Sequence, residues 1–258
     1  MCPKRAHLDL LTLPDFPLVC PGDDLAELIN TSLRKASLKL ENGDVLVIAQ
    51  KIVSKAENRY AYLNEILPTT AAENLALEVN KDPRLVQLIL DESKEVVAKR
   101  PGVLIVEHRM GYVHANAGID HSNISSSEDE PRVLLLPKNP DKSAAKLCHE
   151  LKTEEVSKLS IIINDSAGRA WRNGSIGFAI GTNGFEVVEN MVGHRDLYDR
   201  EMVVTEVAVA DELAAAASFL MGQADESAPV VLIRGAQTKP SNEGSAALIR
   251  EKNKDLFR

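Results

Sequence analysis

The residues best suited to chemistry stand where an apolar run of this chain ends in an acid. The segment 161–184 reads IIINDSAGRAWRNGSIGFAIGTNG and sets Asp165 beside Ser166, followed by Arg169, Arg172 and the only tryptophan. A carboxylate beside a hydroxyl offers the hard oxygen ligands that suit Mg²⁺ or Mn²⁺. The arginines could bind phosphate oxygens, and the glycines would let a phosphate approach backbone N–H groups. The segment therefore indicates a metal and phosphate site, although Asn, Asp and Ser are also typical of the turn that ends a strand.

A second acidic turn occurs in HANAGIDHSNI, residues 114–124. Asp120 follows an apolar residue on a glycine-containing turn, and Asn123 lies three positions later. These side chains could complete a metal and phosphate site, or could form an Asx-turn with a purely local role. His114 and His121 flank the turn at a spacing that matches no recognised metal motif, and we expect at least one of them to be structural.

Two lysines follow the apolar run 45–49 in the stretch AQKIVSKAENR. Lys51 and Lys55 are four positions apart, so they share one face if the segment is helical. Two cations at the end of a strand suit a polyphosphate, while a solvated basic face is the alternative. GHRDLYDRE (193–201) is dense in paired charge and is interpreted as a surface salt-bridge network. In MGQADESAP (221–229), oxygen atoms of Gln223, Asp225 and Glu226 could be ligands, or the stretch could simply end a helix.

Composition narrows the function classes. The chain has 258 residues, 44% of them apolar and 26% charged, which is typical of a globular domain. A formal charge of -8 and only 4% aromatics disfavour a nucleic-acid partner. The three cysteines form neither a disulfide framework nor a zinc pattern, which favours a reducing cytoplasm. No signal peptide and no membrane-spanning run is expected. Walker, dinucleotide-binding and nucleophile-elbow motifs are absent from the sequence.

The pattern of apolar residues predicts the strands and helices that position these motifs. Apolar runs predict strands at 45–49, 103–108, 133–137, 159–164, 176–181 and 230–235. Helical periodicity predicts helices from 21 to 38, from 69 to 99 with a break at Asp82-Pro83, from 139 to 158, from about 211 to 221, and over the tail 244–258. Residues 10–19, with prolines at 14 and 17, should be extended. Because strands and helices alternate irregularly, the fold class is α+β with mixed or antiparallel sheets, in a single domain (1–258) that can contain two closely packed subdomains.

Seven stretches, taken in order, resemble the coenzyme F420-0:L-glutamate ligase family, also called F420 gamma-glutamyl ligases. They are PGDDLAELI, NGDVLVIAQKIVSKAENR, HANAGIDHSN, IIINDSAGRAWRNGSIGFAIG, GHRDLYDREM, VADELAAAASFLMGQA and PVVLIRG. The resemblance implies an intertwined homodimer. It also implies a GTP-dependent ligase that joins the lactyl carboxylate of coenzyme F420-0 to the amine of L-glutamate through an acyl phosphate, with further γ-linked glutamates as an extension. Mg²⁺ or Mn²⁺ at two sites, and K⁺ as an additional ion, are implied as cofactors.

Site residues follow from the matched positions of this family. Asp120, Asp165, Ser166 (where the family often has threonine) and Gln223 would be metal ligands. The nucleotide would contact Phe16, Pro17, Leu18, Val19, Gln50, Lys51, Lys55, Asn123, Gly222, Gln223, Ala224, Asp225, Glu226, Ser227, Ala228 and Pro229. No general base is assigned, with His114 and His121 as the only candidates, and Arg169 and Arg172 have no matched role.

Two departures from the family pattern bear on this interpretation. Asn58 stands where the family commonly has glycine, and asparagine tolerates a left-handed backbone better than most residues. The loop GQADES is more acidic than the usual glycine-rich form, which bears on nucleotide or acceptor specificity. Two alternative functions stay open at this point: an amide ligase for another carboxylated metabolite, and a non-catalytic nucleotide-binding protein.

Overall fold

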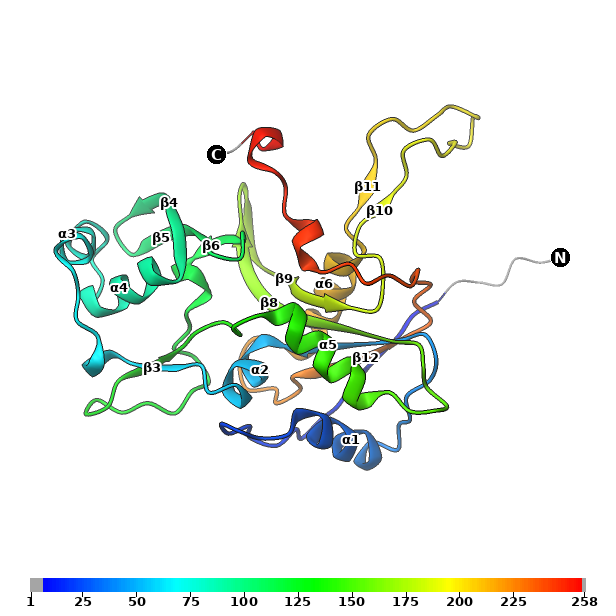
Figure 1. Ribbon diagram of the computed structural model, residues 1–258, viewed down its shortest axis with the longest axis horizontal. Helices are drawn as coiled ribbons and strands as arrows, with labels where there is room; N and C mark the ends of the chain where they lie inside the picture. The colour runs from blue at the N-terminus through cyan, green and yellow to red at the C-terminus, as the bar shows by residue number, and fades with distance from the viewer. Residues whose placement is uncertain (1–6, 257–258) are drawn as a thin grey trace.

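A five-stranded mixed sheet forms the centre of the molecule. The computed structural model describes residues 7–256 (Figure 1). The sheet has the order β1 (Asp9–Thr12), β12 (Val230–Arg234), β2 (Asp44–Ala49), β8 (Leu159–Arg169) and β9 (Arg172–Asn183). Strands β2 and β8 are parallel, and the other neighbours are antiparallel. The predicted α+β class is therefore confirmed, whereas dimerisation stays a prediction.

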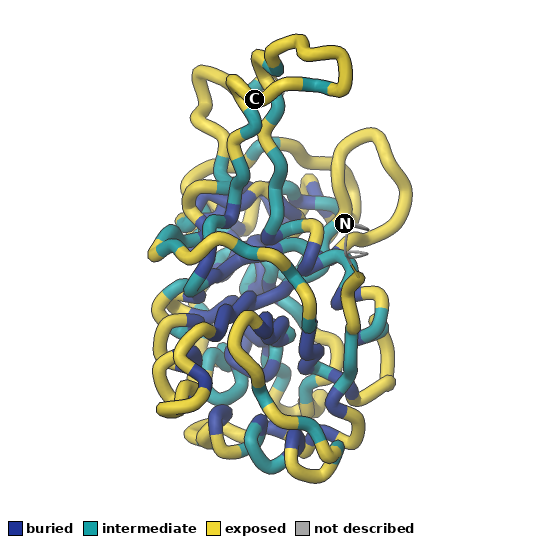
Figure 2. The backbone as a smooth tube through the Cα atoms, turned by 90° about the vertical axis from the view of Figure 1, so that its right-hand side faces the viewer, coloured by how far each residue is buried: buried dark blue, intermediate teal, exposed yellow. Residues whose placement is uncertain are grey.

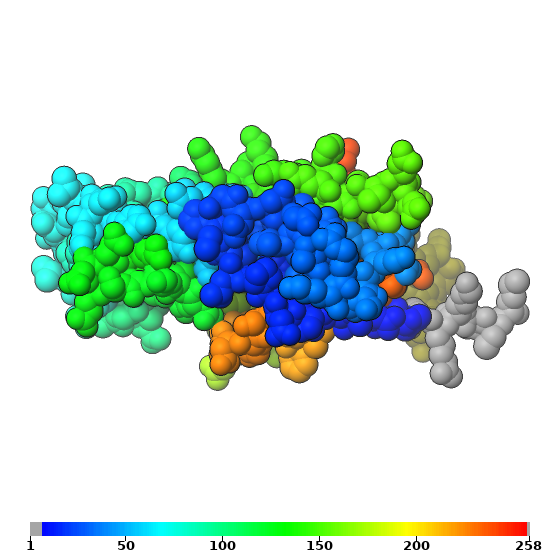
Figure 3. Space-filling view, turned by 90° about the horizontal axis from the view of Figure 1, so that it is seen from below, coloured from blue at the N-terminus to red at the C-terminus, as the bar shows by residue number. Residues whose placement is uncertain are grey.

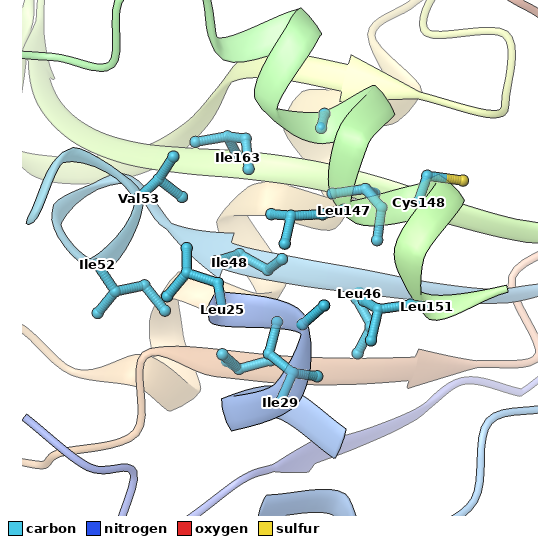
Figure 4. Close-up of a cluster of buried hydrophobic side chains, with 14 of the residues drawn as sticks. Leu25, Ile29, Leu46, Ile48, Ile52, Val53, Leu147, Cys148, Leu151 and Ile163 are labelled. Carbon is cyan, nitrogen blue, oxygen red and sulfur yellow. The ribbon is translucent and has the colours of Figure 1, made fainter. Parts of the chain in front are cut away.

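Helices cover both faces of this sheet, which explains why β2 is apolar at successive positions. Leu46 and Ile48 face α1 (Leu25–Lys35) and α5 (Pro140–Leu151), as Figure 4 shows, while α2 (Gln50–Ala56) continues from the end of β2. Val45 and Val47 face the opposite side, where α6 (Val209–Met221) packs. Figure 2 shows the buried backbone concentrated between these layers. No helix of the described part of the chain is long and apolar enough to cross a membrane.

Residues between α2 and α5 build a second lobe, seen at the left of Figure 1. It contains α3 (Thr70–Val79), α4 (Pro83–Asp91) and the sheet β4 (Ser93–Arg100), β5 (Val103–His108) and β6 (Val113–Ala115), with the pair β3 (Tyr60–Tyr62) and β7 (Arg132–Leu134). The short turns η1 (Leu63–Glu65) and η2 (Asn116–Gly118) belong to the same lobe. Its apolar cluster, which includes Val86, Ile89 and Leu104, is separate from the clusters of the main sheet. The molecule thus has two closely packed parts.

A buried carboxylate lies at the end of α4, between the lobes. Glu92 is 8% exposed, and its Oε2 lies 2.9 Å from Arg109 Nη2, 3.4 Å from Arg59 Nη2 and 3.4 Å from His108 Nε2. Arg59 also donates to the carbonyl of Leu136. Burial by itself raises the pKa of Glu92, but the three bases outweigh it and hold that pKa below its ordinary value. The chain leaving α2 is therefore fixed to the second lobe.

The helices expected over 69–99, with a break at Asp82-Pro83, are confirmed as α3 and α4, but the last part of that stretch and the tail helix are wrong. The helix expected over 69–99 ends at Asp91, and residues Ser93–Arg100 form β4, because Pro101 and Gly102 (φ +81°) turn the chain back to pair with β5. The tail 244–258 contains only the short turns η3 (Ser245–Leu248) and η4 (Lys252–Lys254) within its described residues. Ser245 is held by Asp141 at the start of α5, and this tertiary contact takes precedence over helical propensity. The helix expected over 139–158 also ends early, at Leu151.

Two hairpin-like segments project from the body, as Figure 1 shows. Strands β8 and β9 are longer than predicted and continue beyond the sheet as a two-stranded ribbon that closes at Ala170-Trp171. The second segment, residues 189–207, which we call the arm, is held at its base by β10 (Glu189–Asn190) and β11 (Glu206–Val207). Salt bridges Arg195–Asp199 (3.1 Å) and Arg200–Asp196 (2.9 Å) lie exposed on the arm, which confirms the surface-network interpretation.

Candidate functional site

The candidate site lies where the parallel strands β2 and β8 end side by side. Ala49 pairs with Asn164, so the residues that follow each strand emerge at the same edge of the sheet. Helix α2 begins at Gln50 and places Lys51 and Lys55 one turn apart, while Asp165 and Ser166 follow Asn164 on β8. The carboxyl ends of parallel strands are where open α/β sheets bind ligands.

The turn after η2 brings a second carboxylate to these lysines. Lys51 Nζ lies 2.7 Å from Asp120 Oδ2 and donates to Ser122 Oγ at 2.8 Å. The backbone N–H of Ser122 donates to Asp120 Oδ1 at 2.7 Å. Burial acts to raise the pKa of Asp120, but the Lys51 ammonium and the Ser122 N–H outweigh it, so the pKa of Asp120 is lowered. Asp120 is thus held ionised.

Asp165 has the opposite environment. It is half-buried, and burial raises its pKa to about 7, against the opposing effects of the Ser166 N–H (2.8 Å from Oδ1) and of Lys51. The negative charge of Asp120 adds a smaller upward contribution to the pKa of Asp165. An added cation would lower the pKa of such a carboxyl and hold it ionised. The two carboxylates are therefore close enough to interact, and only Asp120 has a lysine in contact.

The donor set at this edge fits a hard divalent metal. Asp120, Asp165, Ser166 and Gln223 supply carboxylate, hydroxyl and amide oxygens, the ligands that Mg²⁺ and Mn²⁺ prefer. The buried Oδ1 of Asn164 has no hydrogen-bond partner, and Asn164 lines the same pocket. Gln223 uses its Nε2 to donate to Ser218 Oγ at 3.3 Å. Within the described residues, no group of three or more His, Cys, Asp or Glu side chains is arranged to hold a metal ion, here or elsewhere, so the donor set at this edge depends on hydroxyl and amide oxygens beside its two carboxylates.

All of the predicted nucleotide-contact residues meet in one pocket of about 630 Å³, which we call the site pocket. Its walls come from α2, the end of β8 and two crossing loops. The loops are joined by hydrogen bonds from Lys55 Nζ to the carbonyl of Asn123 (2.7 Å) and from Asn123 Nδ2 to the carbonyl of Ala224 (2.8 Å). In Figure 3 the blue N-terminal segment adjoins the green 121–131 loop and the orange segment before β12. The lining includes Phe16, Pro17, Leu18, Val19, Gln50, Lys51, Lys55, Asn123, Asp165, Ser166, Gly222, Gln223, Ala224, Asp225, Glu226, Ser227, Ala228 and Pro229.

Several residues of the site pocket escaped the sequence reasoning. Arg132 lies with its guanidinium 4.5 Å from the centre of the Tyr60 ring, and both line the pocket. Asn164 and Ser218 line it from β8 and α6. Arg132 and Tyr60 come together only through the β3–β7 pairing, so no local pattern could have indicated them. Asn164 stood next to a predicted ligand and could have been included.

The remaining candidates lie outside the site pocket. His114 is buried against Phe178 (ring centres 6.0 Å apart), and burial lowers its pKa to about 4, so it is neutral near pH 7. His121 is exposed and does not line the pocket. Arg169 and Arg172 face each other across the β8–β9 ribbon. The geometry therefore supports neither histidine as a general base.

A second cavity, of about 720 Å³, lies on the other side of α2. Lys138, Lys142 and Lys146 line it, together with Glu57 and Glu150. Glu57 accepts hydrogen bonds from Lys138 N and from the Ser143 hydroxyl, and Lys146 lies 3.8 Å from Glu150. The charges that line this cavity partly neutralise each other, so the β2–β8 edge, with its two interacting carboxylates, is the stronger candidate.

Comparison with known proteins identifies the family. The family model described as F420-0:Gamma-glutamyl ligase matches residues 15–235. The chain belongs to this family. Among its relatives, coenzyme F420:L-glutamate ligases from Methanothermobacter thermautotrophicus and Methanocaldococcus jannaschii are each 43% identical, over 97% and 100% of this chain and 99% and 100% of their own lengths. The protein of that name from Archaeoglobus fulgidus is 39% identical over 98% of this chain and 97% of its own length.

The departure from the family pattern at position 58 is accommodated as expected. Asn58 has φ +52°, in the left-handed region that asparagine tolerates. The turn between α2 and β3 is therefore preserved, and with it the path that carries Arg59 to Glu92. The second departure is the acidic loop 222–227. Its Glu226 side chain forms a hydrogen bond within the loop, where it accepts the backbone N–H of Ala224 at 2.8 Å.

Proposed function

We propose that this chain is a GTP-dependent coenzyme F420-0:L-glutamate ligase. It joins the lactyl carboxylate of coenzyme F420-0 to the amine of L-glutamate, and adds further glutamates through γ linkages. Its relatives carry the name coenzyme F420:L-glutamate ligase over their full lengths, and the family match supports the same reaction here. The observation that carries the proposal is that Lys51, Lys55 and Asp165 line one nucleotide-sized pocket. Asp120 lies just outside that lining, where it contacts Lys51 and interacts with Asp165.

The chemistry requires that a carboxylate be activated before an amine can attack it. We assign the γ-phosphate of GTP to this step, so that its transfer gives an acyl phosphate and GDP, and attack by glutamate then releases phosphate. Phosphoryl transfer depends mainly on positioning and on neutralising charge. Lys51, Lys55 and Arg132 line the site pocket and would hold phosphate oxygens. The pocket volume of about 630 Å³ lies within the range usual for a small-molecule ligand.

Divalent metal belongs to the proposal because the donor set fits it. Asp120, Asp165, Ser166 and Gln223 would hold Mg²⁺ or Mn²⁺ at two sites, with K⁺ as an additional ion. The bound ions would supply neutralisation of the phosphate charge. Lys51 neutralises Asp120 when no metal is bound, and the raised pKa of Asp165 marks the carboxyl that a cation would stabilise most.

A direct assay tests the reaction. Purified protein with F420-0, L-glutamate, GTP and Mn²⁺ should give a product heavier by one or more glutamate residues in mass spectrometry. Excess EDTA should abolish the reaction, and Asp120→Ala should do so with an unchanged circular dichroism spectrum. Full turnover in EDTA, or with Asp120→Ala, would remove the metal assignment. A product with ATP but none with GTP would contradict the nucleotide assignment.

Lys55→Ala tests the nucleotide pocket. Burial, and next the positive charge of Lys51, lower the pKa of Lys55, so a phosphate beside it would relieve both effects. Loss of a charged hydrogen bond of about 1.5 kcal/mol should weaken GTP binding roughly tenfold in calorimetry. Lys146→Ala, in the second cavity, is the matched control and should bind GTP like the wild type. Equal GTP affinity in both variants would exclude Lys55 from the nucleotide site.

A further inference from the structure

The β8–β9 ribbon carries an aromatic and cationic end that the proposed nucleotide site does not use. Trp171 is 77% exposed at the closing turn, and it is the only tryptophan of the chain. Arg169 and Arg172 flank it as a cross-strand pair, and both are exposed. We call residues 169–172 the ribbon end. A large exposed aromatic between two arginines is poorly suited to water and well suited to a ligand with a flat ring and a negative group.

The backbone at the ribbon end is strained in a way that presents this side chain. Trp171 has φ +58°, a left-handed conformation that is uncommon for non-glycine residues and a genuine outlier for a bulky one. Glycine or asparagine would occupy such a turn at lower cost. Strain of this kind is concentrated at functional sites. The two-residue register shift after Gly168, which accommodates Asn173 and Gly174 on β9, keeps Arg172 opposite Arg169.

The ribbon is a continuation of the strand that carries the metal-ligand candidates. Asn164, Asp165 and Ser166 line the site pocket, and the residues of β8 beyond Ser166 do not. In Figure 1 the ribbon rises from the sheet on the side away from α2, which forms a wall of that pocket. With about 3.3 Å per strand residue, Arg169 lies about 13 Å along β8 from Asp165. A nucleotide that fills the pocket would therefore leave this side open to the second substrate.

We propose that the ribbon end binds the part of the acyl substrate remote from its reacting carboxylate, with Trp171 stacking on a planar aromatic ring and Arg169 and Arg172 binding a phosphate between ring and carboxylate. This inference rests on the proposed function, because it assigns the contacts that the acyl substrate of that reaction would make away from its lactyl carboxylate. Trp171 is then a specificity-determining residue. A carboxylated metabolite without ring and phosphate would make none of these contacts.

The single tryptophan makes binding directly measurable. Titrating the wild type with F420-0 should quench tryptophan fluorescence to saturation, whereas GTP should cause little change. Trp171→Ala should raise KM for F420-0 roughly tenfold, as loss of a stacked base does in nucleic-acid sites, and KM for GTP should stay within twofold. Trp171→Phe should restore most of the affinity for F420-0, because a phenyl ring keeps the stacking face. The double variant Arg169→Ala/Arg172→Ala should also raise KM for F420-0.

A matched control separates this site from general effects. Arg34→Ala removes an exposed arginine on α1, far from the ribbon, and should leave both KM values unchanged. Unchanged KM for F420-0 in Trp171→Ala would overturn the inference. Equal rises in KM for F420-0 and GTP in that variant would also overturn it, as would a smaller oligomeric mass of that variant in sedimentation. If the wild type fails to ligate F420-0, the proposed function fails first. If it ligates F420-0 normally while tryptophan emission never changes, only the ribbon-end inference fails.

Discussion

Two carboxylates a short distance apart behave differently because of one lysine. Lys51 contacts Asp120 and keeps it ionised, whereas Asp165 has only the Ser166 N–H as a close donor, and burial raises its pKa to about 7. Because the pKa of Asp165 is higher in the folded protein than in the unfolded chain, the free energy of unfolding depends on pH. Between pH 4 and 7 the folded protein keeps a proton that the unfolded chain has released, so stability falls as pH rises through this range and stays lower above it.

Asp165→Asn should therefore stabilise the metal-free protein while abolishing activity. At pH 8 the neutral amide avoids a charge that burial penalises, so the melting temperature should rise above that of the wild type; at pH 4 the two should melt alike. Mn²⁺ should raise the melting temperature of the wild type but not of the variant. Scanning calorimetry with and without EDTA measures both effects.

Asp91→Asn, at an exposed position on α4, is the control for the charge change itself. It should melt like the wild type at both pH values. Asp165→Asn that melts below the wild type at pH 8 in EDTA would contradict the burial argument, and a normal Mn²⁺ response in that variant would exclude Asp165 as a ligand.

The elements that carry the site are held together by a close approach between β9 and α6. A side-chain carbon on Gly177 would lie 2.8 Å from the Ala214 carbonyl and 2.8 Å from Asn164 Oδ1, and would also meet Ser218 Cβ. Backbone and a buried amide cannot give way as a flexible side chain can. Ser218 in turn accepts from Gln223, so the position of this predicted metal ligand depends on how closely β9 and α6 approach.

Gly177→Ala should push α6 outward, and should lower both stability and metal affinity. The clash involves packed backbone, so a loss of about 1–3 kcal/mol in the free energy of unfolding is expected from overpacking. Gly168→Ala on β8 is the control, because nothing lies within 4 Å of the added carbon. Urea denaturation measures the stability of the two variants, and Mn²⁺ titration measures their metal affinity. Equal stability and equal affinity of Gly177→Ala and Gly168→Ala would show that the close approach of β9 and α6 does not support the site.

Local patterns predicted the central strands well because their residues are buried on both faces. They failed for residues 93–100, where SKEVVAKR continues the helical pattern and only the turn at Gly102 and pairing with β5 determine a strand. The site shows the same division. Lys51, Asp165 and Ser166 follow predicted strands, so the sheet edge could be inferred, whereas the joining of Arg132 with Tyr60 requires the fold. In the loop 222–229 the residue types indicated Gln223, Asp225 and Glu226 as possible ligands, and the resemblance supplied the other residues, which no periodicity distinguishes.

At the scale of the whole molecule, the arm is the feature least explained by a single chain. Leu197 is fully exposed, and Tyr198, Val203 and Val204 are 80%, 71% and 83% exposed. Clustered exposed apolar residues mark interaction surfaces. The arm extends away from the sheet in Figure 1, as an element that wraps around a second copy would. This supports the homodimer implied by the family resemblance, which stays a prediction.

Sedimentation should give a mass twice the 28.2 kDa of one chain. Leu197→Asp combined with Val204→Asp should shift the protein to monomer, because two charges cannot be buried unpaired at an interface. Leu67→Asp, an equally exposed apolar position (89%) in the other lobe, is the control and should leave the dimer intact. A monomeric wild type, or a dimer that resists the arm substitutions, would contradict this role for the arm.

The strand order 1-12-2-8-9 also has a consequence for how the protein is made. Parallel pairing of β2 with β8 must wait until the whole second lobe has been synthesised, and β12, inserted between β1 and β2, arrives later still. Contacts of such long sequence separation slow folding. During translation the second lobe can collapse on its own core first, while affinity for nucleotide should appear only after residue 234 has left the ribosome. Nascent chains arrested before β12 should thus expose the apolar β2 edge and depend on chaperones.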